Sequence, residues 1–384
     1  MATSTTSRES GFTITELLVT TTIMMLVMSG ALTTFRNALT INDSASQLAD
    51  ANQNLRAGTN QLIRDLMMAG RIIGAEGISM PSGAGVVAFN RPGPPGSSLT
   101  FPLIVDADTT LNLPSLSTGF GLGPVITGSA TDTVTIMTID EFTPTISTPP
   151  TNAAAPTVTE ATIAPDGQSL TLPATSLWLA GDAVNDTQPI QVGDLVFFKS
   201  PTANAIQTVT SKDATHIYFA SDAHDWFHFN QPNAPVRPLA IMKGLAVPAA
   251  DPWPSTSPVT LFRALMITYY VDNTTVAGTP RLTRVVNHLT PQALAGVVED
   301  LDLTYDLVSG ETNPVTYATA ITSLPYTDAV AGVTYNSNQV RKVNIHVGVR
   351  SEVLSKPAQD FVRNHISTSV AVRSLASVDR YKTQ

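Results

Sequence analysis

The feature that most constrains this chain is a long uncharged run close to its start. Leu17 to Phe35 are nineteen consecutive residues without Asp, Glu, Lys or Arg, and most of them are apolar. At 1.5 Å per residue, a helix of this length nearly crosses the hydrocarbon core of a bilayer. The run therefore predicts a membrane-spanning helix.

One carboxylate, Glu16, stands immediately before this run. A charged group at the start of a lipid-buried helix is costly to desolvate, so Glu16 is a candidate functional residue. In the alternative interpretation, Glu16 lies at the membrane interface and its side chain reaches out to water. The residue alone does not decide between the two.

After the uncharged run the pattern becomes amphipathic. Apolar residues recur every three or four positions with charged residues between them, which indicates one apolar stripe along a surface helix. No proline occurs before Pro81, and Gly70 follows the last apolar repeat. We therefore expect one helix over residues 12–69, about 87 Å long. Gly30 and Gly58 are expected weak points, because each glycine costs about 1 kcal/mol relative to alanine.

Composition favours an extracytoplasmic, β-rich protein. Only 13% of the 384 residues are charged, whereas Thr, Ser, Ala and Pro are abundant. The net charge of −9 and the lack of a run of Lys or Arg argue against nucleic-acid binding. The sequence has no cysteine, which excludes disulfides, thiol catalysis and cysteine-based zinc sites. The folded part must therefore be held together by its core alone.

Residues 71–384 have the pattern of strands joined by irregular segments. We expect two β-rich modules, 71–230 and 231–384, with an exposed Pro- and Thr-rich loop near 144–165 in the first. Proline-rich sequence separates the two modules. The predicted strands are 99–105, 133–139, 168–172, 194–199, 205–211, 215–220, 259–271, 281–286, 297–307, 340–349 and 365–375.

An acidic strand is one of two candidate ion sites. In strand 297–307, apolar residues alternate with polar ones, so that Leu301 and Leu303 face one way and Thr304 the other. The polar positions include carboxylates that could bind Ca²⁺: Glu299, Asp300, Asp302 and Asp306. Alternate residues on a strand lie about 7 Å apart, too far to share one ion without a loop folding over. A solvated strand face is the simpler interpretation.

The other candidate ion site is His224–His228, which holds two imidazoles and Asp225. Histidines four residues apart share a metal on a helix, but this aromatic segment lies among turn residues. Gly119–Gly123 contains Gly-x-Gly-x-Gly without a following helix pattern, so it predicts a turn rather than a phosphate site. The sequence lacks the motifs of zinc peptidases and serine hydrolases. We expect no enzyme activity, no cofactor and no bound metal.

The first residues resemble a known export signal. A short polar leader ends in Gly11, Phe12 follows, and Glu16 is the fifth residue after the glycine. This arrangement resembles the class III signal of type IV pilins and is equally similar to that of type II secretion pseudopilins. The resemblance implies that a prepilin peptidase cuts between Gly11 and Phe12 and that the new amino terminus of Phe12 is methylated. An ordinary secretory signal fits worse, because its cleavage site follows the apolar run.

The same resemblance divides the N-terminal segment and gives Glu16 a role. It implies a leader peptide over 1–11, a transmembrane and assembly helix over 12–32, and an amphipathic continuation of that helix over 33–70. In this family the glutamate meets the cut amino terminus of the adjacent subunit. The resemblance therefore implies that Glu16 acts in assembly.

Later segments resemble the PilW-like minor pilins, and the J-type pseudopilins share much of this layout. The segments are Arg64–Gly70, 190–198, 267–273, 280–284, 296–306 and 340–350. The stretch 144–165 has no counterpart in that family's pattern. The implied fold is α+β and pilin-like: one long N-terminal helix, half anchor and half amphipathic, followed by a large antiparallel β-rich head.

The resemblance implies a minor pilin, a low-copy subunit that helps to initiate assembly of a type IV pilus or caps it. The alternatives are a pseudopilin at the tip of a type II secretion pseudopilus and a membrane-anchored adhesin or binding module. Implied partners are other minor and major pilins, prepilin peptidase, the inner-membrane assembly platform and a tip adhesin, but no nucleic acid. The expected location is the bacterial inner membrane, crossed once with the head outside, and then the pilus, at its tip.

Overall fold

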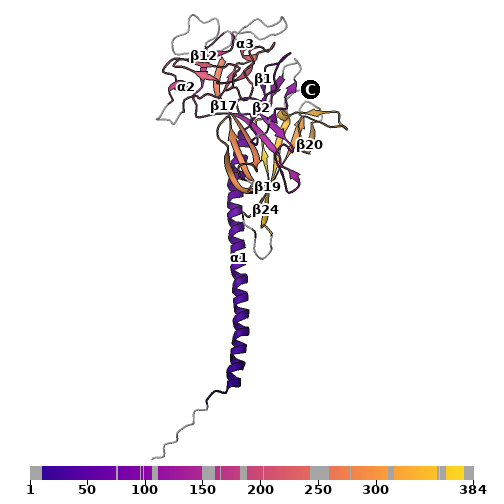
Figure 1. The fold of residues 1–384 in the computed structure, drawn as a ribbon. Coiled ribbons are helices and arrows are strands. Elements are labelled where there is room, and N and C mark those ends of the chain that lie inside the picture. Colours follow the sequence, from indigo (N-terminus) through magenta and orange to yellow (C-terminus); the bar gives the residue numbers. More distant parts are fainter. Residues whose placement is uncertain are drawn as a thin grey trace, which may run out of the picture.

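The computed structural model shows one long helix that carries a β-rich head at its far end (Figure 1). It describes residues 11–74, 77–95, 97, 99–105, 111–148, 161–164, 166–181, 188–201, 203–242, 259–276, 278–309, 315–352, 354 and 360–375. The predicted fold class, α+β with a long N-terminal helix followed by an antiparallel β-rich head, is confirmed. Of the predicted leader, only Gly11 lies within the described residues.

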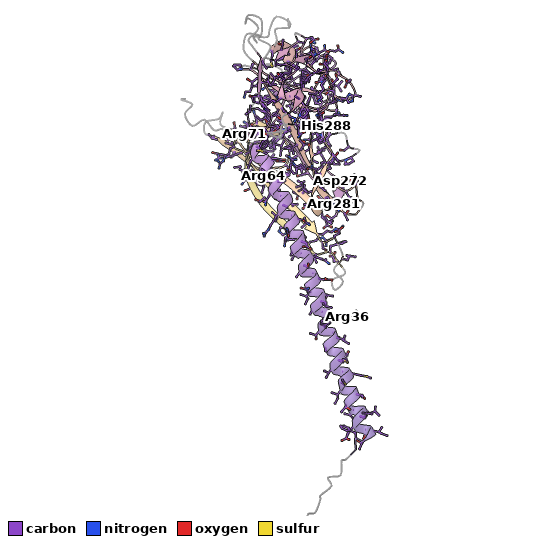
Figure 2. All side chains as sticks on the ribbon, turned by 90° about the vertical axis from the view of Figure 1, so that its left-hand side faces the viewer. Arg36, Arg64, Arg71, Asp272, Arg281 and His288 are labelled. Carbon is purple, nitrogen blue, oxygen red and sulfur yellow. The ribbon has the colours of Figure 1, made fainter. Side chains whose placement is uncertain are left out.

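Helix α1, Ile14–Met68, is 55 residues long and stands clear of the head over its first half. Every residue from 11 to 39 is exposed. Arg36, the first charged residue after the uncharged run, lies on this free half, whereas Arg64 lies where the helix meets the head (Figure 2). The helix thus has a free half and a packed half, and the predicted division between residues 32 and 33 stays a prediction, because residues 33–39 are exposed as well.

The helix ends where the sequence predicts. Its last turn is capped at Ala69, and Gly70 has a φ of +73°, a left-handed conformation that favours glycine. The N–H of Gly70 donates to the carbonyl oxygen of Met137 at 2.9 Å. A Cβ at Gly70 would lie 2.6 Å from a methyl group of Leu375. Both the turn and the close packing therefore require glycine here.

An eleven-stranded antiparallel sheet forms the centre of the head. Its main path runs β14-β13-β17-β18-β19-β23-β24, and β6, β9, β10 and β20 pair beside this path. The strands are β6 (Leu116–Gly119), β9 (Thr133–Ile139), β10 (Ile146–Thr148), β13 (Leu195–Lys199), β14 (Asn204–Thr208), β17 (Val259–Asp272), β18 (Arg281–Val286), β19 (Gln292–Ser309), β20 (Thr316–Ile321), β23 (Val340–Arg350) and β24 (Arg363–Ala371). Strands from 71–230 and 231–384 share this sheet, and the division into two modules stays a prediction.

Smaller sheets and short helices complete the head. The remaining strands are β1 (Ile78–Met80), β2 (Asn90–Arg91), β3 (Leu99–Thr100), β4 (Ile104–Val105), β5 (Leu111–Leu113), β7 (Val125–Ile126), β8 (Ser129–Ala130), β11 (Thr162–Ile163), β12 (Ser169–Thr171), β15 (Ser211–Lys212), β16 (His216–Tyr218), β21 (Tyr326–Thr327) and β22 (Thr334–Tyr335). The short helices are α2 (Leu177–Ala180), α3 (Pro238–Met242) and the 3-10 turn η1 (Ser337–Gln339). The strand β12 and the helices α2 and α3 lie at the end of the head farthest from the free half of α1 (Figure 1).

Two predicted strands, 99–105 and 205–211, are wrong, because each is divided into two strands in the structure. The segment 99–105 holds two short strands in different sheets, since β3 pairs with β2 and β4 pairs with β5. Pro102 lies between β3 and β4 and cannot donate to a strand ladder. The segment 205–211 is also divided, because β14 ends at Thr208 and β15 begins at Ser211. In contrast, the predicted bounds 133–139 and 281–286 are those of β9 and β18.

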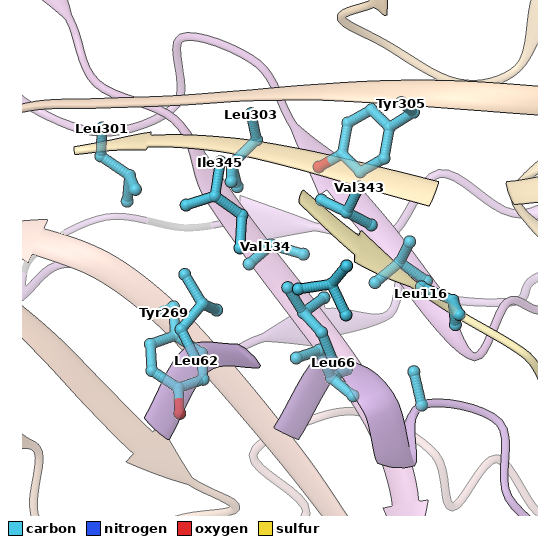
Figure 3. Close-up of a cluster of buried hydrophobic side chains, with 14 of the residues drawn as sticks. Leu62, Leu66, Leu116, Val134, Tyr269, Leu301, Leu303, Tyr305, Val343 and Ile345 are labelled. Atoms are coloured by element: carbon cyan, nitrogen blue, oxygen red, sulfur yellow. The ribbon is translucent and has the colours of Figure 1, made fainter. Parts of the chain in front are cut away.

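The packed half of α1 covers one face of the sheet. Leu55, Leu62 and Leu66 are fully buried and belong to the same apolar cluster as side chains of β17, β19 and β23 (Figure 3). As predicted, Leu301 and Leu303 face this core, while Asp302 between them is exposed. Burying three leucine side chains contributes about 5–9 kcal/mol of transfer free energy. The head is therefore built around the upper end of the helix.

Gly58 is a contact point between helix and sheet. A Cβ at this position would lie 2.9 Å from the Cβ of Ala295 and 3.4 Å from a methyl group of Leu282, whereas a Cβ at Gly30 would meet nothing within 4 Å. We expect Gly58→Leu to lower the free energy of unfolding of the head by about 1–3 kcal/mol, because overpacking forces the helix away from β19. Gly30→Leu should not lower it.

Denaturant unfolding of the detergent-solubilised protein, followed by near-ultraviolet circular dichroism, measures this difference. Gly30→Leu is the matched control, because it makes the same substitution in the same helix without a neighbour. Equal unfolding midpoints for the two variants would contradict the assigned packing role.

Candidate functional site

The predicted cleavage bond lies ahead of the helix, in exposed, non-helical chain. Gly11 and Phe12 are exposed and non-helical, and Ile14 is the first helical residue. A Cβ at Gly11 would meet nothing within 4 Å, so glycine is not required there by the packing of this chain. A bond in exposed, non-helical chain is accessible to a peptidase. Cleavage between Gly11 and Phe12 stays a prediction.

Glu16 forms a capping box with Thr13 at the start of α1. The Thr13 N–H donates to Glu16 Oε2 at 3.1 Å, and the Glu16 N–H donates to Thr13 Oγ1 at 3.3 Å. The Thr13 hydroxyl also donates to Glu16 Oε2 at 2.9 Å. The box satisfies two amide groups that a helix start leaves unpaired, and the carboxylate lies at the positive end of the helix dipole. Glu16 is thus held at the helix start, where a neighbour's ammonium could reach it.

The capping box is a role that the sequence analysis missed. Its signal is present as Thr13-Ile14-Thr15-Glu16, a Thr-x-x-Glu pattern before an apolar run. The box gives Glu16 a function within its own chain, besides the two interpretations of its charge. A test of the assembly role must therefore separate the charge of Glu16 from its capping hydrogen bonds.

Threonine hydroxyls in the free half of α1 bond to the backbone of the helix itself. Thr20 donates to the Glu16 carbonyl at 2.8 Å, and Thr33 donates to the Ser29 carbonyl at 2.8 Å. A hydroxyl bonded in this way is not left unpaired in lipid or between packed helices. By length and composition, α1 is apolar enough to cross a membrane. The free half therefore suits both a bilayer and a bundle of neighbouring helices.

A buried polar network fixes the upper end of α1 to the sheet. Asp65 is 1% exposed, and its Oδ2 accepts hydrogen bonds from the Tyr269 hydroxyl at 2.6 Å and from Arg284 Nε at 2.7 Å. Gln61 Nε2 donates to the other carboxylate oxygen at 3.1 Å. Because the partners come from α1, β17 and β18, the network sets the position of the helix on the sheet.

The charges in this network compensate one another. Burial and the Asp65 carboxylate together raise the pKa of Tyr269, so its phenol stays neutral. Burial alone would lower the pKa of Arg284, but the hydrogen bond and the charge of Asp65 raise it. The network therefore contains one carboxylate, one guanidinium and a neutral phenol. No local pattern could reveal it, because Asp65 and Tyr269 are 204 positions apart.

Three of the four carboxylates of β19, those of Glu299, Asp300 and Asp306, lie beside basic side chains of neighbouring strands. Glu299 accepts hydrogen bonds from Arg350 Nε and from Arg363 Nε, each at 2.9 Å. Asp306 is paired with Lys342 at 2.7 Å. Within the described ranges, no group of three or more His, Cys, Asp or Glu side chains could hold a metal ion. The calcium interpretation of this strand therefore has no structural support.

The imidazoles of His224 and His228 have separate partners as well. His224 Nδ1 lies 3.5 Å from Asp222 Oδ1, and His228 Nδ1 lies 3.0 Å from the Ala88 carbonyl oxygen. Asp225 accepts hydrogen bonds from two backbone N–H groups that follow it, and its burial raises its pKa to about 6. This carboxylate therefore stabilises the turn instead of pointing to a metal with the histidines.

Comparison with known proteins identifies the N-terminal segment. Residues 6–32 match the family model described as the prokaryotic N-terminal methylation motif. This match supports a type IV pilin-like protein. No curated protein and no solved structure matches the chain. For a type IV pilin-like protein, the class III motif implies processing by prepilin peptidase and assembly with other pilins, and the apolar helix that follows indicates a membrane anchor.

Proposed function

We propose that this chain is a minor pilin, a low-copy subunit that helps to initiate a type IV pilus or caps it. The observation that carries the proposal is the methylation motif at the start of a helix whose first half is exposed and apolar. Such a surface is stable in lipid before assembly and among the helices of other subunits afterwards. The large head on the same helix favours a low-copy position, because a repeating subunit must fit within each small rise of a fibre.

Assembly then depends on moving the free half of α1 from lipid into a helix bundle. In both surroundings, a lone carboxylate and a lone ammonium are costly, so bringing them together offsets part of the cost of burying each. We infer that Glu16 receives the ammonium of Phe12 from an adjacent processed subunit. The capping box holds the carboxylate at the helix start, so the pair would set the stagger between neighbouring helices.

Two other functions would use the same anchor. A pseudopilin at the tip of a type II secretion pseudopilus needs the same motif, and a membrane-anchored adhesin could use it for export alone. Deleting the gene, counting surface pili and assaying secreted enzymes tests all three. Loss of pili with normal secretion supports the minor pilin, and loss of secretion with normal pili indicates the pseudopilin. Normal pili and secretion with reduced surface binding indicate the adhesin.

Processing gives the most direct prediction of the proposal. We expect Gly11→Leu to leave full-length precursor in the membrane, because a bulky side chain would lie beside the scissile bond. Mass spectrometry of the purified protein measures the mass of the amino-terminal peptide. Gly30→Leu serves as a control, since it places the same side chain in the exposed part of the helix and should be cleaved normally. Assembled protein that begins at Met1 in the unmutated strain would rule out cleavage after Gly11.

A further inference from the structure

Strand β24 is an exposed edge of the central sheet. It is the last strand on the main path, and among the described residues no strand pairs with its other side. It is nine residues long and contains no proline, and its only acidic or basic side chain besides a histidine is Arg363. Natural proteins usually block such edges with short strands, charges or proline, because an open edge is a template for pairing. The edge of β24 is not blocked in these ways.

The register shows which backbone groups of β24 are free to pair. Val372 N–H donates to the Arg341 carbonyl, and Ser351 N–H donates to the Val362 carbonyl. Hydrogen-bonded and non-bonded pairs alternate along an antiparallel ladder. Val362 and Val372 are thus in hydrogen-bonded pairs, and so is every second residue between them. The remaining residues of β24 direct their N–H and C=O groups away from β23: Arg363, His365, Ser367, Ser369 and Ala371. Each of these five residues is exposed.

Two hollows lie beside this edge on the face of the sheet opposite α1. One, of about 510 Å³, is lined by Glu299, Asp300 and Asp302 of β19, by β24 and by the turn between β7 and β8. The other, of about 530 Å³, is lined by side chains that include Asp302, His346 and Ser367. Because β23 lies between β19 and β24, a strand added at this edge would lie about 14 Å from β19, and only long side chains directed back across β24 would approach these hollows.

The carboxylates on this face that lack a full ion-pair partner give it a negative charge. Glu299 is neutralised by two arginines, but Asp302 has no ion-pair partner among the described residues. Asp300 has only His346, at 3.6 Å, and burial and the nearby Asp302 raise the pKa of Asp300. A partner with positive side chains would therefore be favoured here, and one with negative side chains disfavoured.

We propose that the edge of β24 binds an extended segment of another protein by strand addition, and that this segment carries Lys or Arg at alternate positions. Backbone hydrogen bonds to the five outward-facing residues supply the affinity. The carboxylates of β19 lie behind β23 and β24 and favour long basic side chains through the negative field on this face. The edge lies on the head, clear of the apolar half of α1, so this pairing does not depend on the proposed pilus role. Figure 1 shows β24 on the part of the head nearest to that free half of the helix.

The test uses the full-length protein in detergent and a labelled peptide of nine residues, the length of β24. The peptide has Lys at alternate positions with Thr or Val between them, and a twin peptide has Glu in place of Lys. Fluorescence anisotropy measures binding, and isotope-edited infrared spectroscopy of a carbon-13-labelled peptide reports strand formation. We expect saturable binding of the Lys peptide as a strand and at least tenfold weaker binding of the Glu peptide.

Ser367→Pro and Ser367→Ala form the matched pair of variants. Both lose the hydrogen bond between the Ser367 hydroxyl and His346, but only proline removes the outward N–H and places a ring on the edge. We expect proline to weaken peptide binding about tenfold or more relative to alanine. Its fixed φ does not match an antiparallel strand, so it should also lower the thermal midpoint, and binding is compared at a temperature at which both variants are folded. The double variant Asp300→Asn/Asp302→Asn tests the charge separately and should weaken binding about threefold to tenfold.

Three results would overturn the proposal. The first is no saturable binding of the Lys peptide or equal binding of its Glu twin. The second is equal binding of the Lys peptide to Ser367→Pro and Ser367→Ala. If the proline variant unfolds, the deciding result is instead unchanged binding of the Lys peptide to Asp300→Asn/Asp302→Asn. The third is a dimer of the full chain that Ser367→Pro dissociates, because the occupant of the edge would then be a second copy.

Discussion

Replacing Asp65 by alanine should lower the free energy of unfolding of the head by about 3–5 kcal/mol. The substitution leaves the Arg284 guanidinium without the carboxylate that it contacts at 2.7 Å, and it removes the acceptor of the Tyr269 hydroxyl. An unpaired charge in the interior costs far more than an exposed ion pair contributes. Because typical domains are stable by about 5–15 kcal/mol, this one change should remove a large part of the total.

Asp43→Ala is the matched control for this experiment. Asp43 lies on the same helix, but it is exposed. Denaturant unfolding in detergent, followed by tryptophan fluorescence, should show a much lower midpoint for Asp65→Ala and an unchanged midpoint for Asp43→Ala. Equal midpoints for the two variants would mean that the network contributes nothing to the position of the helix.

A double variant shows whether Asp65→Ala destabilises the head through the lost contacts of Asp65 or through the unpaired charge of Arg284. In Asp65→Asn/Arg284→Met both charges are gone, and the amide still offers an acceptor to Tyr269. Replacing a buried ion pair by well-packed neutral side chains is often neutral or stabilising. The double variant should therefore unfold at a higher denaturant concentration than Asp65→Ala. If it is less stable than Asp65→Ala, the main cost of the single change is lost packing rather than an unpaired guanidinium.

The long helix was predictable because its signals are local. The uncharged run, the repeat of apolar residues and Gly70 at the end all lie along one segment, and α1 ends at Met68, close to the predicted residue 69. The alternation in 297–307 likewise gave the buried face of β19, because side chains on a strand alternate between its two faces. Such patterns predict an element and the face that it buries.

What the sequence could not predict depends on pairing between distant segments. Strand 133–139 was predicted with the bounds of β9, but no local pattern indicates that it lies between β6 and β17 in the central sheet. Asp65 looked like one of several charged residues on a surface helix until Arg284 and Tyr269 were placed beside it. From the sequence, Gly58 looked like a weak point in the helix. Its packing role was not predictable, because its neighbours Leu282 and Ala295 come from strands more than two hundred residues later.

Glu16→Gln should reduce incorporation of this subunit into pili while leaving its processing and the folding of its head intact. Glutamine can accept the capping hydrogen bonds that Glu16 accepts from Thr13, so the helix start is kept. The variant removes only the charge that we propose to pair with the ammonium of an adjacent subunit. Breaking a buried pair of this kind costs about 3–5 kcal/mol, whereas loss of a helix cap costs about 0.5–2 kcal/mol.

Thr13→Val provides the opposite change. It removes the capping hydroxyl that accepts from the Glu16 N–H, but it keeps the carboxylate. If pairing controls assembly, pili should be fewer with Glu16→Gln than with Thr13→Val, when each variant complements a deletion strain and the cleaved protein is equally abundant. A subunit at the extreme tip has fewer neighbours, so the loss there should be partial. Normal piliation with Glu16→Gln and defective piliation with Thr13→Val would instead mean that Glu16 acts as a helix cap, and the pairing mechanism would then have to be abandoned.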